Sequence, residues 1–285
     1  GYDTTLSEPR FIDHGEVTAN VFTEDSHILE INSKSGLYPL YMAYSIYRTR
    51  VKNSLFSVTN IEEEQRIWDK VVAENIFVIC KTPMAKSITK RTLIGFRKAK
   101  VNTRYFEDLI NQIKNKPEHF IKQVDKFVSE RTGIKNMKNM KFNAIVGNPP
   151  YQVMNDGAGA SASPVYNFFV DISKRLSPKH MSLIMPARWF AGGRGVDEFR
   201  KTMLADKQLS LIHDYFDARA CFSNVEIKGG IMYFRWDKGY YGNCHVVSHT
   251  PNGTVSIADR PLVMTGMDSF IRHNEAVSIV EKVRK

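Results

Sequence analysis

Short apolar runs alternate along this chain with longer amphipathic stretches. This alternation is typical of strands joined by helices in a largely parallel sheet, so we predict an α/β fold with helices on both faces. The apolar runs predict strands at His27–Ile31, Ile76–Cys80, Phe142–Gly147, Met181–Met185, Ser210–Tyr215 and Ile227–Arg235. The amphipathic stretches predict helices at Leu37–Arg50, Glu62–Asn75, Met84–Leu93, Phe106–Phe127, Val165–Leu176 and Val196–Leu204. Pro117 is expected to break the fourth helix, because proline has no amide hydrogen to donate.

Three segments depart from this alternation. Asn155–Ser163 is small and polar, which predicts a loop, and Ala191–Gly195 is rich in glycine with one arginine. From about Ser248 onward the alternating pattern is lost. We therefore expect one core over residues 1–247 and the beginning of a second, incomplete region over residues 248–285.

Composition narrows the function only slightly. The 285 residues carry a formal net charge of +10, which favours polyanionic partners, although many basic proteins bind none. No apolar run is long enough to span a membrane and no signal peptide opens the sequence, so we expect a cytoplasmic protein that makes no membrane contact. Its three cysteines are Cys80, Cys221 and Cys244. Their wide spacing and the absence of an HExxH motif predict neither a disulfide framework nor a metal site.

The segment Phe142–Tyr151, FNAIVGNPPY, carries the chemistry. An apolar strand delivers Asn148, Pro149, Pro150 and Tyr151 to its carboxyl end, where open α/β sheets bind ligands. The prolines stiffen the loop, so the Asn148 side-chain oxygen and the Pro149 carbonyl can hold both hydrogens of one planar amino group. Tyr151 can stack on the ring that carries that group. The alternative is a proline-stiffened turn with an ordinary tyrosine.

An NPPY tetrapeptide after a strand resembles the signature of methyltransferases that act on planar amino nitrogens. The chain is similar to the gamma class of adenine-specific DNA methyltransferases from bacterial restriction–modification systems. This resemblance implies a Rossmann-like class I fold with an antiparallel edge strand and S-adenosylmethionine as cofactor. It also implies transfer of a methyl group to adenine N6 in double-stranded DNA. The full-length protein could then include a restriction endonuclease domain or subunit, and residues 248–285 would begin a target-recognition region.

The resemblance also assigns a second ring to the target base. Cys221–Phe234, CFSNVEIKGGIMYF, resembles the motif in which a phenylalanine ahead of an antiparallel strand faces an extruded base. Phe222 occupies that position and would clamp the base with Tyr151. A buried aromatic residue at the edge of a strand is the alternative for Phe222.

The cofactor motifs match the family less closely. Cys80 stands where a ribose-binding acid is usual, and Asn143 stands where aspartate is common. Asp108 would accept from the cofactor's adenine amino group, or else serve only at a helix start. Phe169 would pack on the adenine, or else only in the core. The positions that the resemblance assigns to the cofactor are Thr18 in GEVT, Glu30, Ser35 and Gly36 in ILEINSKSGLY, Asp108 in FEDL and Phe169 in VYNFF.

Other functions are compatible with the same motif. NPPY also occurs in methyltransferases that act on ribosomal RNA or on a glutamine of release factors. A catalytically inactive DNA-binding subunit could keep the same fold, and the sparse glycine before Leu37 together with Cys80 favours it.

Overall fold

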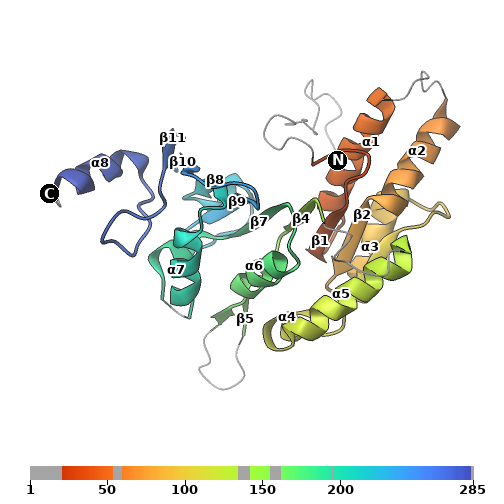
Figure 1. Ribbon diagram of the computed structural model, residues 1–285, viewed down its shortest axis with the longest axis horizontal. Coiled ribbons are helices and arrows are strands. Elements are labelled where there is room, and N and C mark those ends of the chain that lie inside the picture. Colours follow the sequence, from red (N-terminus) through yellow and green to blue (C-terminus); the bar gives the residue numbers. More distant parts are fainter. Residues whose placement is uncertain (1–20, 54–59, 134–141, 155–161, 194, 284–285) are drawn as a thin grey trace. The chain divides into compact units, whose positions relative to one another are not determined.

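A computed structural model describes residues 21–53, 60–133, 142–154, 162–193 and 195–283 (Figure 1). Thr18 and most of the Asn155–Ser163 segment lie outside these residues. The chain divides into two compact units, which comprise residues 1–106 and 107–285.

The first unit is built on three parallel strands in the order β1-β2-β3. Every residue of β1 and β2 is buried, and β2 has the continuous apolar sequence expected of such a strand, whereas β1 also buries the polar residues Glu30, Asn32 and Ser33. Helix α2 begins after Asn60, whose side chain accepts from the Glu63 amide at 2.8 Å, and α3 begins with Pro83 after the N-cap residue Thr82. The elements of this unit are β1 (Ile28–Ser33), α1 (Leu37–Asn53), α2 (Ile61–Glu74), β2 (Ile76–Cys80), α3 (Pro83–Ile94) and β3 (Asn102–Tyr105).

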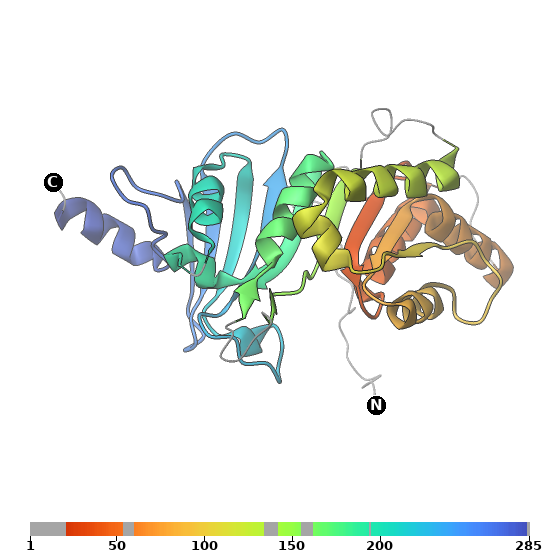
Figure 2. The ribbon, with the colours of Figure 1, turned by 90° about the horizontal axis from the view of Figure 1, so that it is seen from below.

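The second unit has strands in the order β11-β10-β8-β9-β7-β4. All of them run in one direction except β9 and β11, and β9 lies between β7 and β8. The strands are β4 (Ala144–Gly147), β7 (His180–Pro186), β8 (Leu209–Tyr215), β9 (Ile231–Asp237), β10 (Cys244–His249) and β11 (Val255–Arg260), with a separate pair β5 (Gln152–Val153) and β6 (Ser163–Pro164). The helices are α4 (Leu109–Asn115), α5 (Pro117–Thr132), α6 (Tyr166–Arg175), α7 (Asp197–Ala205) and α8 (Asn274–Val283), with short 3₁₀ turns η1 (Ala187–Ala191) and η2 (Ala218–Ala220). Figure 2 shows strands of the larger sheet of this unit side by side.

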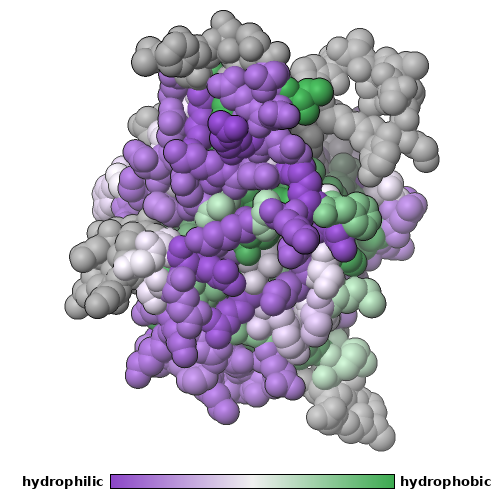
Figure 3. All heavy atoms as spheres, turned by 90° about the vertical axis from the view of Figure 1, so that its right-hand side faces the viewer, coloured by the Kyte–Doolittle hydropathy of each residue, from purple (hydrophilic) through white to green (hydrophobic). Residues whose placement is uncertain are grey.

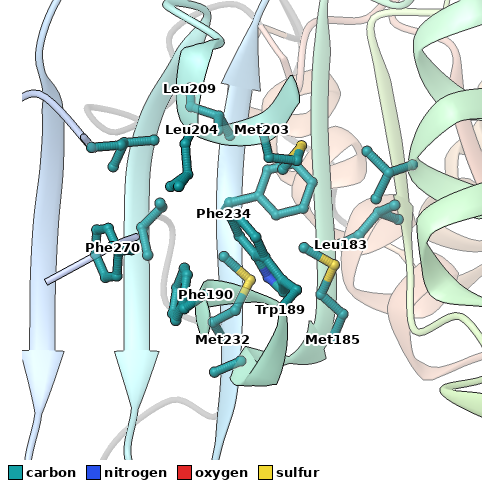
Figure 4. Packing of buried hydrophobic residues seen from close by; sticks show 14 of the residues in the cluster. Leu183, Met185, Trp189, Phe190, Met203, Leu204, Leu209, Met232, Phe234 and Phe270 are labelled. Carbon is teal, nitrogen blue, oxygen red and sulfur yellow. The ribbon is translucent and has the colours of Figure 1, made fainter. Parts of the chain in front are cut away.

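A large apolar cluster packs much of the second unit. Side chains from β7, β8, β9, α6, α7 and η1 meet in it, including Trp189 and Phe234, which are both fully buried (Figure 4). Phe270, from the segment after β11, stacks on Phe190 with ring centroids 4.3 Å apart. The C-terminal segment therefore belongs to the packing of this unit. In contrast to this buried cluster, the outer face of the protein shown in Figure 3 is largely hydrophilic.

The apolar runs predicted the strands β1, β2, β4, β7 and β8 and most of β9, and the break at Pro117 separates α4 from α5. Among the described strands, the sheet has an antiparallel strand at one edge, β11, while the strand predicted at Ile227–Arg235 lies inside the sheet as β9 and begins only at Ile231. Strands β3, β10 and β11 were not predicted. The division expected at residues 247/248 falls within β10, so the sheet continues past it. That residues after 248 begin a target-recognition region stays a prediction.

Within the described residues, no helix combines the length and apolar character needed to cross a membrane. In the same part of the chain, no three His, Cys, Asp or Glu side chains are grouped so that they could hold a metal ion.

Candidate active site

The NPPY segment leaves the sheet at the carboxyl end of β4. Strand β4 is buried along its length and pairs in parallel with β7, so that Gly147 lies opposite Leu183. Pro149 is buried, while Asn148 and Tyr151 are half-buried. The Tyr151 carbonyl accepts a hydrogen bond from the Val165 amide at 3.2 Å, and the β5–β6 pair continues from there. The segment is thus fixed by the strand before it and by the start of α6 after it.

The polar side-chain atoms of this segment are shielded from solvent. Both the Asn148 side-chain oxygen and the Tyr151 hydroxyl are buried. A hydrogen bond made in such surroundings is stronger than one exposed to water, because few water molecules compete for the polar atoms. The segment therefore has the composition and the surroundings to orient a planar amino group.

Phe222 lies in a long connection from β8 to β9, which we call the Phe222 loop (Phe216–Gly230). Strands β4, β7 and β8 run in the same direction, so the Phe222 loop and the NPPY segment leave the same edge of the sheet. Phe222 is half-buried, and its amide donates to the Ala218 carbonyl at 2.9 Å. A ring in this position is open enough to contact a ligand while its backbone is held.

The two ends of the Phe222 loop are pressed together. Gly230 has a φ of +80°, and a Cβ atom there would lie 2.2 Å from the Tyr215 carbonyl oxygen. The Gly230 carbonyl also accepts from the Ala187 amide at 3.1 Å, which connects the loop to the end of β7. This close approach requires the second glycine of KGGIMYF, Gly230, whereas Gly229 is favoured by its φ of +92°.

Glu30 is a buried carboxyl group on β1 in the first unit. Only 4% of its surface is exposed, and burial raises its pKa to about 7, against a hydrogen bond with Ser33 and the charge of Lys34. Its Oε2 atom has no hydrogen-bond partner among the residues that the structure describes. A cationic ligand group could therefore bind to this oxygen.

The turn that follows β1 depends on Gly36. Its φ is +78°, and a Cβ atom would lie 2.9 Å from the Thr89 Cα of α3. Ser35 is exposed, and its carbonyl accepts from the Thr92 hydroxyl at 2.6 Å. The candidate residues Ser35 and Gly36 thus lie where the turn packs closely on α3. Ser35 is exposed there, and Gly36 is buried.

Cys80 is fully buried in the first unit. Its thiol donates to the Thr89 hydroxyl at 3.9 Å, and burial raises its pKa to about 11. The thiol is therefore neutral at physiological pH, so it cannot take the place of a ribose-binding carboxylate.

The remaining cofactor candidates lie in the second unit. Asp108 is exposed at the N-terminus of α4, where its side chain makes no capping hydrogen bond. Phe169 is only 1% exposed on α6, so its ring packs in the protein interior. Its neighbour Phe168 is half-buried, with the Lys114 ammonium 5.7 Å from its ring centroid. The VYNFF sequence did not reveal which of its rings is accessible, because that depends on how α6 faces the core.

Residues 74–222, more than half of the chain, match the model of the Eco57I restriction-modification methylase family. The chain belongs to this family. The matched residues include both the NPPY segment and Phe222. The family membership confirms the resemblance to restriction–modification methyltransferases that the sequence motifs indicated.

Relatives of this Eco57I-family chain carry related descriptions. A Mycoplasma pneumoniae protein described as an uncharacterized adenine-specific methylase is 39% identical over 112 residues, which are 38% of this chain and 26% of that protein. A modification subunit of a putative type I restriction enzyme from Vibrio vulnificus YJ016 matches with a TM-score of 0.51 at 11% identity, over 95% of this chain and 50% of that one. The type IIL restriction-modification enzyme MmeI, solved in complex with DNA, matches with a TM-score of 0.52 at 10% identity, over 86% of this chain and 36% of MmeI.

The solved structures establish the fold of the Eco57I-family chain. It is the expected Rossmann-like class I methyltransferase fold with a mostly parallel sheet. The chain spans about half of the Vibrio subunit, and its match to the Mycoplasma protein covers about a quarter of that relative.

Proposed function

We propose that this chain transfers a methyl group from S-adenosylmethionine to the N6 amino group of adenine in double-stranded DNA, as the modification activity of a restriction–modification system. The observation that carries the proposal is the NPPY segment at the carboxyl end of the buried strand β4, in a chain of the Eco57I methylase family. The description of the Mycoplasma relative as an adenine-specific methylase supports adenine as the target.

Asn148 and Pro149 would hold the target amine. The Asn148 side-chain oxygen and the Pro149 carbonyl each accept one amine hydrogen, which directs the nitrogen lone pair away from the base ring. Pro150 keeps the segment stiff, and Tyr151 and Phe222 stack on the base, which offsets part of the cost of removing it from the duplex. These residues position and polarise the amine, and its proton can leave to water after the transfer.

Glu30 is the residue that fits the cofactor best. S-adenosylmethionine, when bound, supplies an electrophilic methyl group on its sulfonium and carries an ammonium group. The unpartnered Oε2 atom of Glu30 can accept from that ammonium group. We further propose Ser35, Gly36 and the exposed Asp108 as cofactor contacts. The burial of Phe169 favours core packing for its ring, and Thr18 stays a prediction.

DNA is the proposed macromolecular partner. The net charge of +10 supports it, and Arg188 is exposed at the end of β7, on the edge that carries the NPPY segment. A guanidinium at this edge is suited to a DNA phosphate. We expect a restriction endonuclease domain or subunit to accompany this activity in the full-length protein. The reaction would take place in the cytoplasm, where bacterial DNA lies.

Transfer of tritium from labelled S-adenosylmethionine tests the substrate class. We expect label in unmethylated duplex DNA and none in ribosomal RNA or a release factor. Label in ribosomal RNA but not in DNA would make an RNA base the target. Label in the release factor but not in DNA would make the glutamine amide the target.

An inactive DNA-binding subunit is the second candidate, because the neutral, buried Cys80 thiol cannot make the ribose contact of a carboxylate. Calorimetry separates the two candidates. We expect S-adenosylmethionine to bind with measurable heat and Glu30→Ala to weaken its binding. Binding of DNA without any binding of S-adenosylmethionine would favour the inactive subunit.

A further inference from the structure

Arg272 makes a dense set of contacts at the base of the Phe222 loop. Its guanidinium donates two hydrogen bonds to Asp214, at 2.7 Å and 2.5 Å, and a third to the Gly229 carbonyl at 2.9 Å. Its Cζ atom also lies 4.1 Å from the ring centroid of Phe216. Because Phe216 begins the loop and Gly229 lies at its end, one side chain contacts both ends.

Asp214 gives this arrangement a fixed anchor. Its side chain is 0% exposed on β8, two residues before the loop begins. A carboxylate in such a site needs a paired, hydrogen-bonded cation, and the fork of an arginine satisfies both of its oxygens. Arg272 is thus held in one orientation, in which its Nη1 atom donates to the Gly229 carbonyl.

Arg272 belongs to a short segment that we call the C-terminal strap (Phe270–Asn274). The strap is fastened along its length: the Phe270 ring stacks on Phe190, the Ile271 carbonyl accepts from Arg260, and the Arg272 carbonyl accepts from the Ser248 hydroxyl at 2.8 Å. His273 meets the Phe216 ring edge to face, with ring centroids 4.8 Å apart. The C-terminal strap therefore contacts the Phe222 loop directly, so a shift of the strap would move the loop.

We propose that Arg272 is a positioning residue for the target base. By joining Asp214, Phe216 and Gly229, it holds the Phe222 loop in a conformation that presents the Phe222 ring before a base arrives. It also makes base capture dependent on the docking of the C-terminal strap. This inference rests on the proposed function, because it assigns a target base to Phe222.

A double-mutant cycle between Arg272 and Phe222 tests this inference, with unmethylated bacterial genomic DNA as methyl acceptor. Arg272→Lys keeps the charge but loses the fork, so we expect the KM for DNA to rise on the order of tenfold, with the Kd for S-adenosylmethionine little changed. If Arg272 acts through Phe222, Arg272→Lys should have little further effect in a Phe222→Ala background. Equal effects of Arg272→Lys in both backgrounds would overturn the proposal.

Arg200→Lys is the matched control. Arg200 also joins the core to the C-terminal segment, through Asp268 at 3.4 Å, but its contacts within the described residues lie outside the Phe222 loop. We expect this variant to keep the wild-type KM for DNA. If the KM for DNA also rose tenfold in Arg200→Lys, Arg272 would stabilise the fold only in a general way, and its positioning role would be overturned. If Arg272→Lys does not fold, the neutral double variant Asp214→Asn/Arg272→Gln replaces it in the cycle, with the same expected and contradicting results.

Hydrogen exchange separates failure of this inference from failure of the proposed function. Absence of methyl transfer to DNA by the wild-type chain would end the proposed function. The amides of Phe222, Val225 and Gly230 donate within the loop and still report on its order. They should exchange at least tenfold faster in Arg272→Lys than in Arg200→Lys. Equal exchange in the two variants would overturn the role of Arg272 in holding the loop.

Discussion

The carboxyl group of Glu30 sets an expected pH dependence of stability. Burial raises its pKa from 4.5 to about 7 in the folded chain. Between these two pH values the folded chain keeps a proton that the unfolded chain releases. The contribution of Glu30 to the free energy of unfolding therefore falls as the pH rises from about 4.5 to about 7, and it changes no further above that range.

Replacing Glu30 by glutamine removes this dependence while preserving the shape of the side chain. We expect Glu30→Gln to become more stable relative to the wild type as the pH rises from 4.5 to 7, by roughly 2–3 kcal/mol for the shift of the Glu30 pKa. Urea unfolding at pH 5 and at pH 8 measures this change. The same stability difference at both pH values would show that the Glu30 carboxyl is ionised within the folded chain at pH 5.

At the scale of elements, the turn from β1 to α1 depends on the missing side chain of Gly36. A Cβ atom there would meet the backbone of Thr89 at 2.9 Å, in a turn with a φ of +78°. We expect Gly36→Ala to lower the free energy of unfolding by roughly 2–5 kcal/mol, from left-handed strain and steric overlap together.

Gly95→Ala is the control that introduces backbone strain without steric overlap. Gly95 also has a positive φ, +61°, but a Cβ atom would meet nothing within 4 Å among the described residues. Its replacement should cost about 1–3 kcal/mol in urea unfolding, from the strained backbone alone. Equal losses for the two variants would mean that the turn does not pack on α3 as described.

The sequence predicted those elements whose burial leaves a continuous or periodic apolar signal. Strand β3 reads NTRY and pairs only with β2 among the described strands, so half of its residues remain partly exposed and its sequence stays polar. Strand β11, VSIADR, has only one buried residue and is defined by its pairing with β10 rather than by a buried face. Pairing with a neighbouring strand does not leave a periodic signal in the sequence.

The candidate site divides in the same way. The NPPY segment could be found because its residues are adjacent in the chain and follow a buried strand. The contact of Arg272 with Asp214 joins residues 58 positions apart, so no local pattern indicated it. The sequence left Phe169 open between packing on the adenine and packing in the core, since a motif position does not show which way its side chain faces.

At the scale of the whole molecule, the charge of +10 predicts DNA binding that depends strongly on salt. Each phosphate contact releases condensed counterions, so about six contacts would weaken binding roughly a thousandfold between 50 and 200 mM salt. Fluorescence anisotropy with a labelled duplex at several salt concentrations measures this slope. An affinity that does not change with salt would mean that phosphates contribute little to binding.

If the chain methylates adenine N6 in DNA through its NPPY segment, the modified nucleoside is the product to measure. The chain and its Asn148→Ala variant would be incubated with S-adenosylmethionine and unmethylated duplex DNA, which is then digested to nucleosides for mass spectrometry. We predict N6-methyldeoxyadenosine with the wild type and about a hundred- to a thousandfold slower formation with Asn148→Ala, because one preorganised hydrogen-bond acceptor is lost. Formation at the wild-type rate by Asn148→Ala would contradict the role of Asn148, and no N6-methyldeoxyadenosine from the wild type would contradict methylation of adenine N6.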